Sequence, residues 1–206
     1  WQNVLNFTRT FNSVHNLTAT AVQEYTHSET EYMDGSVYEL SDPFFSEHII
    51  SNTFGQKDVG GWKSENGLAS YMFRANYNYD SKYYIGASIR YDGLSKLPKD
   101  TRWGTFWGAS AAWRLSREKF WTEAPVNEWF NDLRLRASYA TIGNSALGSD
   151  YPYLGTYGAK LVGPMAGIAW NVMGNNNLKW ETTETFDIGL DGACLLYTSD
   201  AADDLI

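Results

Sequence analysis

Between Gly67 and Arg114 the sequence alternates large apolar side chains with polar ones over three consecutive stretches. Successive side chains of a strand point to opposite faces, so this two-residue period predicts three β-strands, each with one apolar and one polar face. Aromatic residues stand at or near both ends of each apolar stripe. From Trp103 to Trp113 a strand tilted by about 40° crosses roughly 25 Å, which is the height of the lipid-facing band of an outer-membrane barrel. The pattern therefore predicts the wall of a transmembrane β-barrel.

Four further stretches repeat this pattern, at residues 5–11, 17–25, 133–141 and 178–190. In the last of them Glu184 falls on the apolar face, which predicts a local bulge or a position near the lipid headgroups. Bacterial single-chain barrels close on an even number of strands. About seven strands, with an edge at each end, therefore predict an all-β, antiparallel piece of a larger barrel wall.

The connections between these strands alternate between short and long. Tight turns are predicted at Asn12-Ser13-Val14 and at Asp80-Ser81, whereas residues 30–66 and 143–177 have no sustained period and are predicted long loops. A loop at 93–101 and a connection at 115–131 complete the order, and Ser116 is predicted to cap one helical turn in that connection. Outer-membrane barrels have short periplasmic turns and long extracellular loops, so the end of the barrel with the long loops is predicted to face the outside of the cell.

Composition and charge exclude several function classes. The 206-residue chain has a formal net charge of -8 and no basic cluster, which argues against a nucleic-acid partner. It lacks the run of about eighteen apolar residues that a transmembrane helix needs. The three histidines, His15, His27 and His48, share no metal-ligand spacing, and no spaced nucleophile and base is present. We therefore expect no enzyme activity, metal or cofactor.

The two ends of the chain predict an interrupted reading frame. The chain starts at Trp1, without an initiator Met or a signal peptide, so we expect a truncated N-terminus. At the other end, Cys194-Leu-Leu-Tyr-Thr-Ser-Asp-Ala-Ala-Asp203 resembles the translation of a transposase-type sequencing adaptor. We expect residues 1–193 to form a partial barrel domain and residues 194–206 to be non-biological. Cys194 then supports no argument about redox compartment.

Several blocks between about residues 66 and 193 follow one another in an order typical of a known family. They are Arg74-Ala-Asn-Tyr-Asn-Tyr-Asp-Ser-Lys-Tyr-Tyr84, Ala87-Ser-Ile-Arg-Tyr-Asp-Gly93, Arg102-Trp-Gly-Thr-Phe106, Ala112-Trp-Arg-Leu-Ser-Arg-Glu-Lys-Phe-Trp121, Leu133-Arg-Leu-Arg-Ala-Ser-Tyr139, Gly143-Asn144 and Leu178-Lys-Trp-Glu-Thr-Thr183. Together these blocks resemble the SusC/RagA family of TonB-linked outer-membrane proteins. The first 65 residues resemble it only in general style.

This resemblance implies a Bacteroidota-type importer in the outer membrane, with a 22-stranded barrel and an N-terminal plug. It implies energy supplied by TonB through an N-terminal segment that this chain lacks. It also implies a SusD-like surface lipoprotein that acts as a lid and captures glycans or peptides. Within such a protein the chain would be the later part of the barrel, surrounded by outer-membrane lipid.

The polar face of the predicted strands carries five arginines, namely Arg74, Arg90, Arg114, Arg134 and Arg136. On the inner face of a barrel they have two interpretations: contacts to the plug or to an anionic substrate, and plain solvation of a polar lumen. Trp62 and Trp170 lie in the predicted long loops, where an indole can stack on the apolar face of a sugar ring or pack within its own loop. Both choices stay open at the level of sequence.

Two other classes of protein fit parts of the pattern. A passive porin or an adhesin barrel would share the wall but would carry no plug upstream. A soluble secreted carbohydrate-binding β-sandwich also alternates and displays aromatics, but it hides its apolar face between two sheets. Polar faces rich in Arg and Asn, opposite apolar faces that end in aromatics, favour lipid outside and water inside.

Overall fold

The computed structural model describes residues 1–38, 56–125 and 130–194 of the chain. Its elements are β1 (Gln2–Phe11), β2 (His15–Val37), β3 (Lys57–Tyr79), β4 (Tyr83–Leu94), β5 (Trp103–Arg114), the 3-10 turn η1 (Leu115–Arg117), α1 (Lys119–Thr122), β6 (Phe130–Asn144), β7 (Thr156–Val162), β8 (Met165–Val172) and β9 (Glu181–Cys194). Seven strands form one sheet in the order β1-β2-β3-β4-β5-β6-β9, and β7 pairs with β8 in a separate hairpin. Every pairing is antiparallel, so the predicted seven-stranded antiparallel wall is confirmed.

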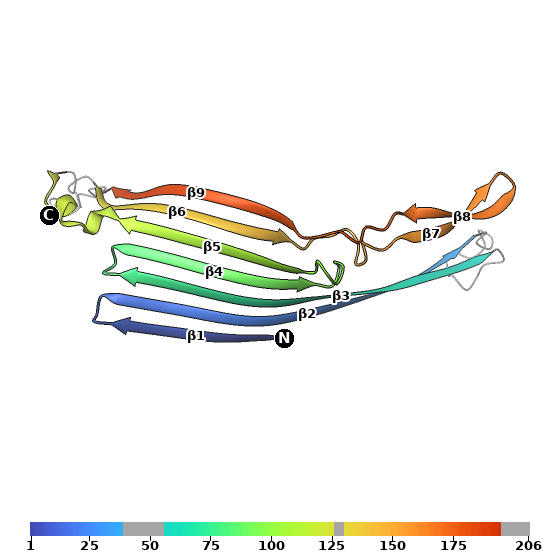
Figure 1. Cartoon of the computed structure of the whole chain (residues 1–206), viewed down its shortest axis with the longest axis horizontal. Coiled ribbons are helices and arrows are strands. Elements are labelled where there is room, and N and C mark those ends of the chain that lie inside the picture. Colours follow the sequence, from blue (N-terminus) through green and yellow to red (C-terminus); the bar gives the residue numbers. More distant parts are fainter. Residues whose placement is uncertain (39–55, 126–129, 195–206) are drawn as a thin grey trace, which may run out of the picture.

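The sheet is open, with β1 and β9 at its two edges (Figure 1). None of the helices in the described ranges is long and apolar enough to cross a membrane. Residues 194–206 were expected to be adaptor-derived. Of these, Cys194 ends β9, and residues 195–206 lie outside the described residues.

The tight turns gather at one end of the sheet, together with the β5–β6 connection (Figure 1). Asn12 and Ser13, and likewise Asp80 and Ser81, have positive φ angles between 49° and 60°. Two consecutive residues with positive φ make a type I′ turn, whose twist matches that of the flanking strands. Asn and Asp tolerate this conformation better than most residues, which explains why the chain reverses at these positions. Both predicted turns are confirmed.

Two long two-stranded arms extend from the opposite end of the sheet (Figure 1). The first arm is the outer part of β2 and β3, which stay paired without interruption from His15 and Tyr79 to Val37 and Lys57. The second arm is the hairpin of β7 and β8. The predicted loop at 30–66 is therefore wrong over the described residues, and the predicted loop at 143–177 is wrong in its middle. A ribbon with water on both faces has no reason to alternate apolar and polar residues, so its strands left no period in the sequence.

The register of the strands places outward-facing residues of neighbouring strands opposite one another, and inward-facing residues likewise. Ala75, Ala87 and Ala109 lie side by side on the outward face, and the neighbouring inward positions are polar or small. Few side chains of the described residues are buried, and the buried apolar ones among them are Leu94, Leu97 and Phe106, near the end that carries the arms. The apolar face as a whole is exposed, and no second sheet covers it in the described parts of the chain. The β-sandwich alternative is therefore wrong.

Two local predictions need correction. Ser116 does not cap a helix: its hydroxyl donates to Asp132 at 2.8 Å, and Glu118 occupies the N-cap position of α1. Of the two predicted explanations for Glu184, the bulge is wrong, because Glu184 pairs in register with Thr141 and the irregularity between β6 and β9 lies at Phe130 and Asp132. A position near the lipid headgroups stays a prediction. The Glu184 carboxylate accepts a hydrogen bond from the Tyr139 hydroxyl on the same face.

Candidate functional site

Two rows of aromatic side chains border the outward face of the sheet. At the end that carries the arms, the ring centroids of Tyr91 and Trp103 are 4.7 Å apart and those of Tyr71 and Trp103 are 6.5 Å apart. At the end with the tight turns, Tyr83 stacks at 6.3 Å on both Tyr79 and Trp113. The face between the rows is apolar and exposed, with Phe73, Ile85, Ile89 and Trp107 each about half accessible. Aromatic girdles around an apolar band are the mark of a strand wall in contact with lipid.

Three of the five predicted inward arginines form ion pairs on their own face. Arg90 lies 2.7 Å from Asp92 and also donates to Ser70 at 3.1 Å. Arg114 makes two bonds to Asp132, at 2.7 and 2.8 Å. Arg136 lies 3.4 Å from Asp191. Because each guanidinium already faces a carboxylate, these three side chains carry little free positive charge. The Arg114 and Arg136 ion pairs join neighbouring strands, whereas Asp92 lies on the same strand as Arg90, which reaches β3 through its bond to Ser70.

The other two arginines have no carboxylate oxygen at ion-pair distance within the described ranges. The guanidinium of Arg134 lies 5.8 Å from the centre of the Tyr84 ring, a cation–π distance, and its Nε is buried without a hydrogen-bond acceptor. Arg74 is exposed on the inward face, two positions along β3 from Asn76. Of the five predicted residues, Arg74 is the one whose charge stays available, because Arg134 interacts electrostatically with Asp132 and lies directly opposite Asp191 of β9.

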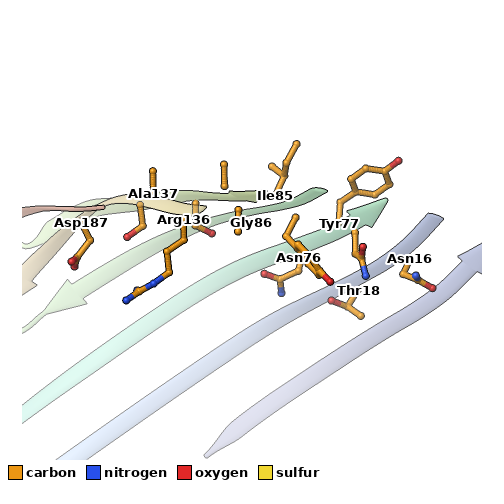
Figure 2. A pocket seen from close by; sticks show the side chains of 15 residues that line it. Asn16, Thr18, Asn76, Tyr77, Ile85, Gly86, Arg136, Ala137 and Asp187 are labelled. Carbon is orange, nitrogen blue, oxygen red and sulfur yellow. The ribbon is translucent and has the colours of Figure 1, made fainter. Parts of the chain in front are cut away.

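The inward face is hollowed over β2 to β6 and β9, with a cavity of about 560 Å³ (Figure 2). Thr18, Asn76, Arg136 and Asp187 project from one side of the sheet, whereas Tyr77 and Ile85 project from the other (Figure 2). The lining combines amides, hydroxyls and small residues, and includes Asn16, Asn78, Gly86, Ser110 and Ser138. Such a surface suits water and neutral hydrogen-bonding groups.

Each of the two predicted tryptophans is one half of an exposed Tyr–Trp pair on an arm. Trp62 stacks on Tyr32 across β2 and β3, with ring centroids 5.8 Å apart and planes at 27°. Trp170 meets Tyr157 across β7 and β8, at 4.2 Å and 35°. All four side chains are at least half exposed. The two tyrosines were missed because their segments were predicted to be loops, in which no cross-strand partner can be assigned.

A carboxylate between the arms, that of Asp150, was also missed. It accepts hydrogen bonds from Ser64 and, at 3.1 Å, from Asn66, both on β3. Lys96, from the β4–β5 connection, lies 3.0 Å away. The hydrogen bond from Ser64, followed by that from Lys96, lowers the pKa of Asp150. No sequence motif marks this residue, since its three partners come from distant parts of the chain.

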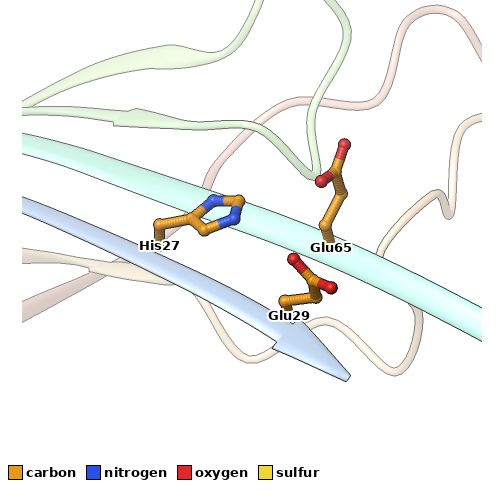
Figure 3. Close-up of side chains that lie close together, drawn as sticks. All are labelled: His27, Glu29 and Glu65. Atoms are coloured by element: carbon orange, nitrogen blue, oxygen red, sulfur yellow. The ribbon is translucent and has the colours of Figure 1, made fainter. Parts of the chain in front are cut away.

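His27, Glu29 and Glu65 lie together on the outward side of the first arm (Figure 3). Their possible ligand atoms are within 4.8 Å of one another, and all three side chains are exposed. Lys63 already binds Glu29 at 2.5 Å, and this hydrogen bond lowers the pKa of Glu29. The group is thus a partly neutralised surface cluster, and its geometry alone does not make a metal site.

An open antiparallel sheet with an apolar outer band, aromatic borders and a polar, hollowed inner face defines a section of a membrane β-barrel. The sequence comparisons agree with this class. Residues 1–203 match the family described as TonB dependent receptor-like, beta-barrel. The chain belongs to this family and is part of an outer-membrane β-barrel.

Individual relatives support the same assignment. The chain is 31% identical to TonB-dependent receptor P39 of Formosa agariphila, over 92% of this chain and 18% of that protein. It is 33% identical to TonB-dependent receptor SusC of Bacteroides thetaiotaomicron, over 66% of this chain and 14% of that protein. The RagAB peptide importer in its open-open state superimposes with a TM-score of 0.79 at 25% identity, over 94% of this chain and 21% of that one. The chain therefore spans about a fifth of the length of these relatives or less.

Proposed function

We propose that this chain forms part of the barrel wall of an importer that takes large nutrients across the outer membrane with energy from TonB. Membership in the TonB-dependent receptor family is the observation that carries the proposal. It also disfavours the passive-porin and adhesin alternatives. The amides, hydroxyls and small side chains that line the hollow of the inner face give a path that suits neutral hydrogen-bonding solutes.

The two Tyr–Trp pairs are the proposed ligand contacts, and the ligand class they favour is a neutral oligosaccharide. Flat, exposed aromatic faces match the apolar faces of sugar rings. The first arm also carries more acidic than basic side chains, with Glu29, Glu31, Asp34, Asp58 and Glu65 against Lys57 and Lys63. Such a surface disfavours anionic ligands. The similarity to the RagAB peptide importer favours a peptide as the second candidate.

A SusD-like lipoprotein at the arm-bearing end is the proposed partner. Its support is the similarity to SusC and to the RagAB importer. Within the barrel, Arg74 is the first proposed contact to the plug or to a passing substrate, because no carboxylate of the described residues forms an ion pair with it. Arg134 is the second proposed contact, although Asp132 and Asp191 lie near it on the same face. Arg90, Arg114 and Arg136 are instead proposed to stabilise the wall.

Two substitutions in the intact receptor test the ligand contacts. Trp62→Ala and Trp170→Ala together are expected to weaken the binding of fluorescein-labelled neutral oligosaccharides by about tenfold, because the stacking surfaces are lost. Phe120→Ala is the matched control, since Phe120 is also an exposed aromatic but lies at the end with the tight turns. Unchanged binding of oligosaccharides, with weakened binding of peptides from digested casein, would move the assignment to the peptide. Uptake of both pools without TonB would contradict the importer.

A further inference from the structure

Asp150 connects three separate segments at the base of the two arms. Its Oδ1 accepts from Asn66 and faces Lys96, and its Oδ2 accepts from Ser64. The side chains of Asp150 and Lys96 are each only 17% exposed, although both lie at the water-exposed end of the sheet. Within the described ranges, Lys96 is the charged group that faces Asp150, and β3 supplies only the neutral Ser64 and Asn66. The junction is therefore satisfied and largely closed to solvent.

The position of this junction relates it to both aromatic pairs. Ser64 lies two residues from Trp62 on the same face of β3, and Asp150 precedes β7 by a short segment of the chain. From Gly67 outward along the arm, β2 is the one described strand that pairs with β3. A two-stranded ribbon without further support bends easily. The contacts of Asp150 are thus the point at which the second arm is fastened to the first.

The β4–β5 connection reinforces this fastening. Ser95 and Gly67 exchange two hydrogen bonds, from the Gly67 amide to the Ser95 hydroxyl at 2.8 Å and from the Ser95 amide to the Gly67 carbonyl at 2.9 Å. Lys96, the next residue, is thereby held against β3 at the level of Asn66. Leu97 follows as the most deeply buried large side chain of the described residues. The backbone of Lys96, whose ammonium group faces Asp150, is therefore held in place.

We propose that Asp150 is a positioning residue that holds the two arms at a fixed separation, so that the Tyr32–Trp62 and Tyr157–Trp170 pairs act as one composite surface for a single ligand. The separation of the arms is a property of the protein alone, whereas the role of the surface rests on the proposed function. A ligand that spans both pairs binds more tightly when the arms are already in place, because ordering them costs binding free energy.

Distances between spin labels on the two arms test the first part. Val59 and Ile168 are 89% and 80% exposed and carry the labels after Val59→Cys and Ile168→Cys in an intact receptor. Asp150→Asn keeps the shape of the side chain but removes its charge, and the distance distribution is expected to become about twofold broader. Glu31→Gln is the matched control, since it removes one carboxylate from the first arm, away from the junction. If Asp150→Asn fails to assemble, Lys96→Met with Ser64→Ala disrupts the junction from the other side.

Ligand binding tests the second part. With both tryptophans intact, Asp150→Asn is expected to weaken binding of the labelled neutral oligosaccharides by about three- to tenfold. An unchanged distance distribution in the junction variants would overturn the inference, whatever the ligand. The composite surface would be overturned if Asp150→Asn broadens the distance distribution but leaves oligosaccharide binding unchanged, while Trp62→Ala and Trp170→Ala weaken that binding. If Trp62→Ala and Trp170→Ala leave oligosaccharide binding unchanged, the proposed ligand contacts are wrong. The distance measurement then still decides whether Asp150 positions the arms.

Discussion

The indole of Trp180 meets the buried ring of Phe106 edge-on, with ring centroids 5.2 Å apart and planes at 73°. Phe106 lies on the inward face of β5, and Trp180 directly precedes β9. The indole Nε1 also donates to the carbonyl oxygen of Arg102 at 2.8 Å. The segment that enters β9 is thus fixed to the segment that enters β5, on the arm-bearing side of the wall.

Glycines provide the space for this contact, which makes Gly143 a sensitive position. A Cβ added at Gly143 would lie 2.1 Å from Cζ of Phe106. Gly143→Ala should therefore lower the free energy of unfolding in phospholipid vesicles by about 1–3 kcal/mol, as overpacking does in other closely packed sites. Phe106→Leu should recover part of the loss. Gly148→Ala is the control, since nothing lies within 4 Å of a Cβ at that position. Equal stability of Gly143→Ala and Gly148→Ala would contradict the close contact.

Neighbouring residues of β3 should respond in opposite ways to a new charge. Ala75 lies midway between the two aromatic rows on the outward face, and Asn76 lies on the inward face. Ala75→Arg should cost about 2–4 kcal/mol of stability in lipid, and Asn76→Arg much less, because only the first places a charge in the hydrocarbon region. Urea unfolding in vesicles measures both. Equal costs would mean that the outward face does not contact lipid.

The membrane-spanning wall could be predicted from the sequence because lipid and water impose opposite demands on its two faces. The alternation around Phe73 and Ile89, and the tight turn at Asp80, therefore matched the structure closely. Outside the lipid band that demand disappears. The strands beyond His27 and the β7–β8 hairpin left no period, and they were predicted as loops.

The candidate site was predictable only in part, for a similar reason. The alternation of residues along each strand placed the arginines on the polar face. Their partners depend on the register between strands, as for Arg114 of β5 and Asp132 of β6. Tyr32 and Tyr157 could be paired with tryptophans only once the arms were known to be strands. Asp150 has partners from two distant segments, β3 and the β4–β5 connection, and no local sequence pattern predicts such a contact.

The junction at Asp150 should show its own acid titration. Hydrogen bonds from Ser64 and Lys96 lower the pKa of Asp150. A carboxyl group with a lowered pKa contributes stability above its ordinary pKa of about 3.9, and loses it as the pH falls through the lowered value. The arms should therefore keep their separation from neutral pH down to at least that range. Lys96→Met should raise the pKa of Asp150, as measured by isotope-edited infrared titration with Asp150→Asn subtracted. An unchanged titration in Lys96→Met would contradict the ion pair.

The two inward ion pairs Arg114–Asp132 and Arg136–Asp191 should differ in strength because they differ in geometry and exposure. Arg114 makes two short bonds to Asp132, and both side chains are less than one third exposed. Arg136 and Asp191 are 3.4 Å apart and about half exposed. Double-mutant cycles to alanine should give a coupling of about 1.5–3 kcal/mol for the first pair, as for other hydrogen bonds to charged groups, and about 0.2–1 kcal/mol for the second. High salt should weaken only the second pair appreciably, because water and ions reach it. Equal couplings would contradict the predicted effect of geometry and exposure, and couplings near zero for both pairs would instead assign these arginines to solvation of the lumen.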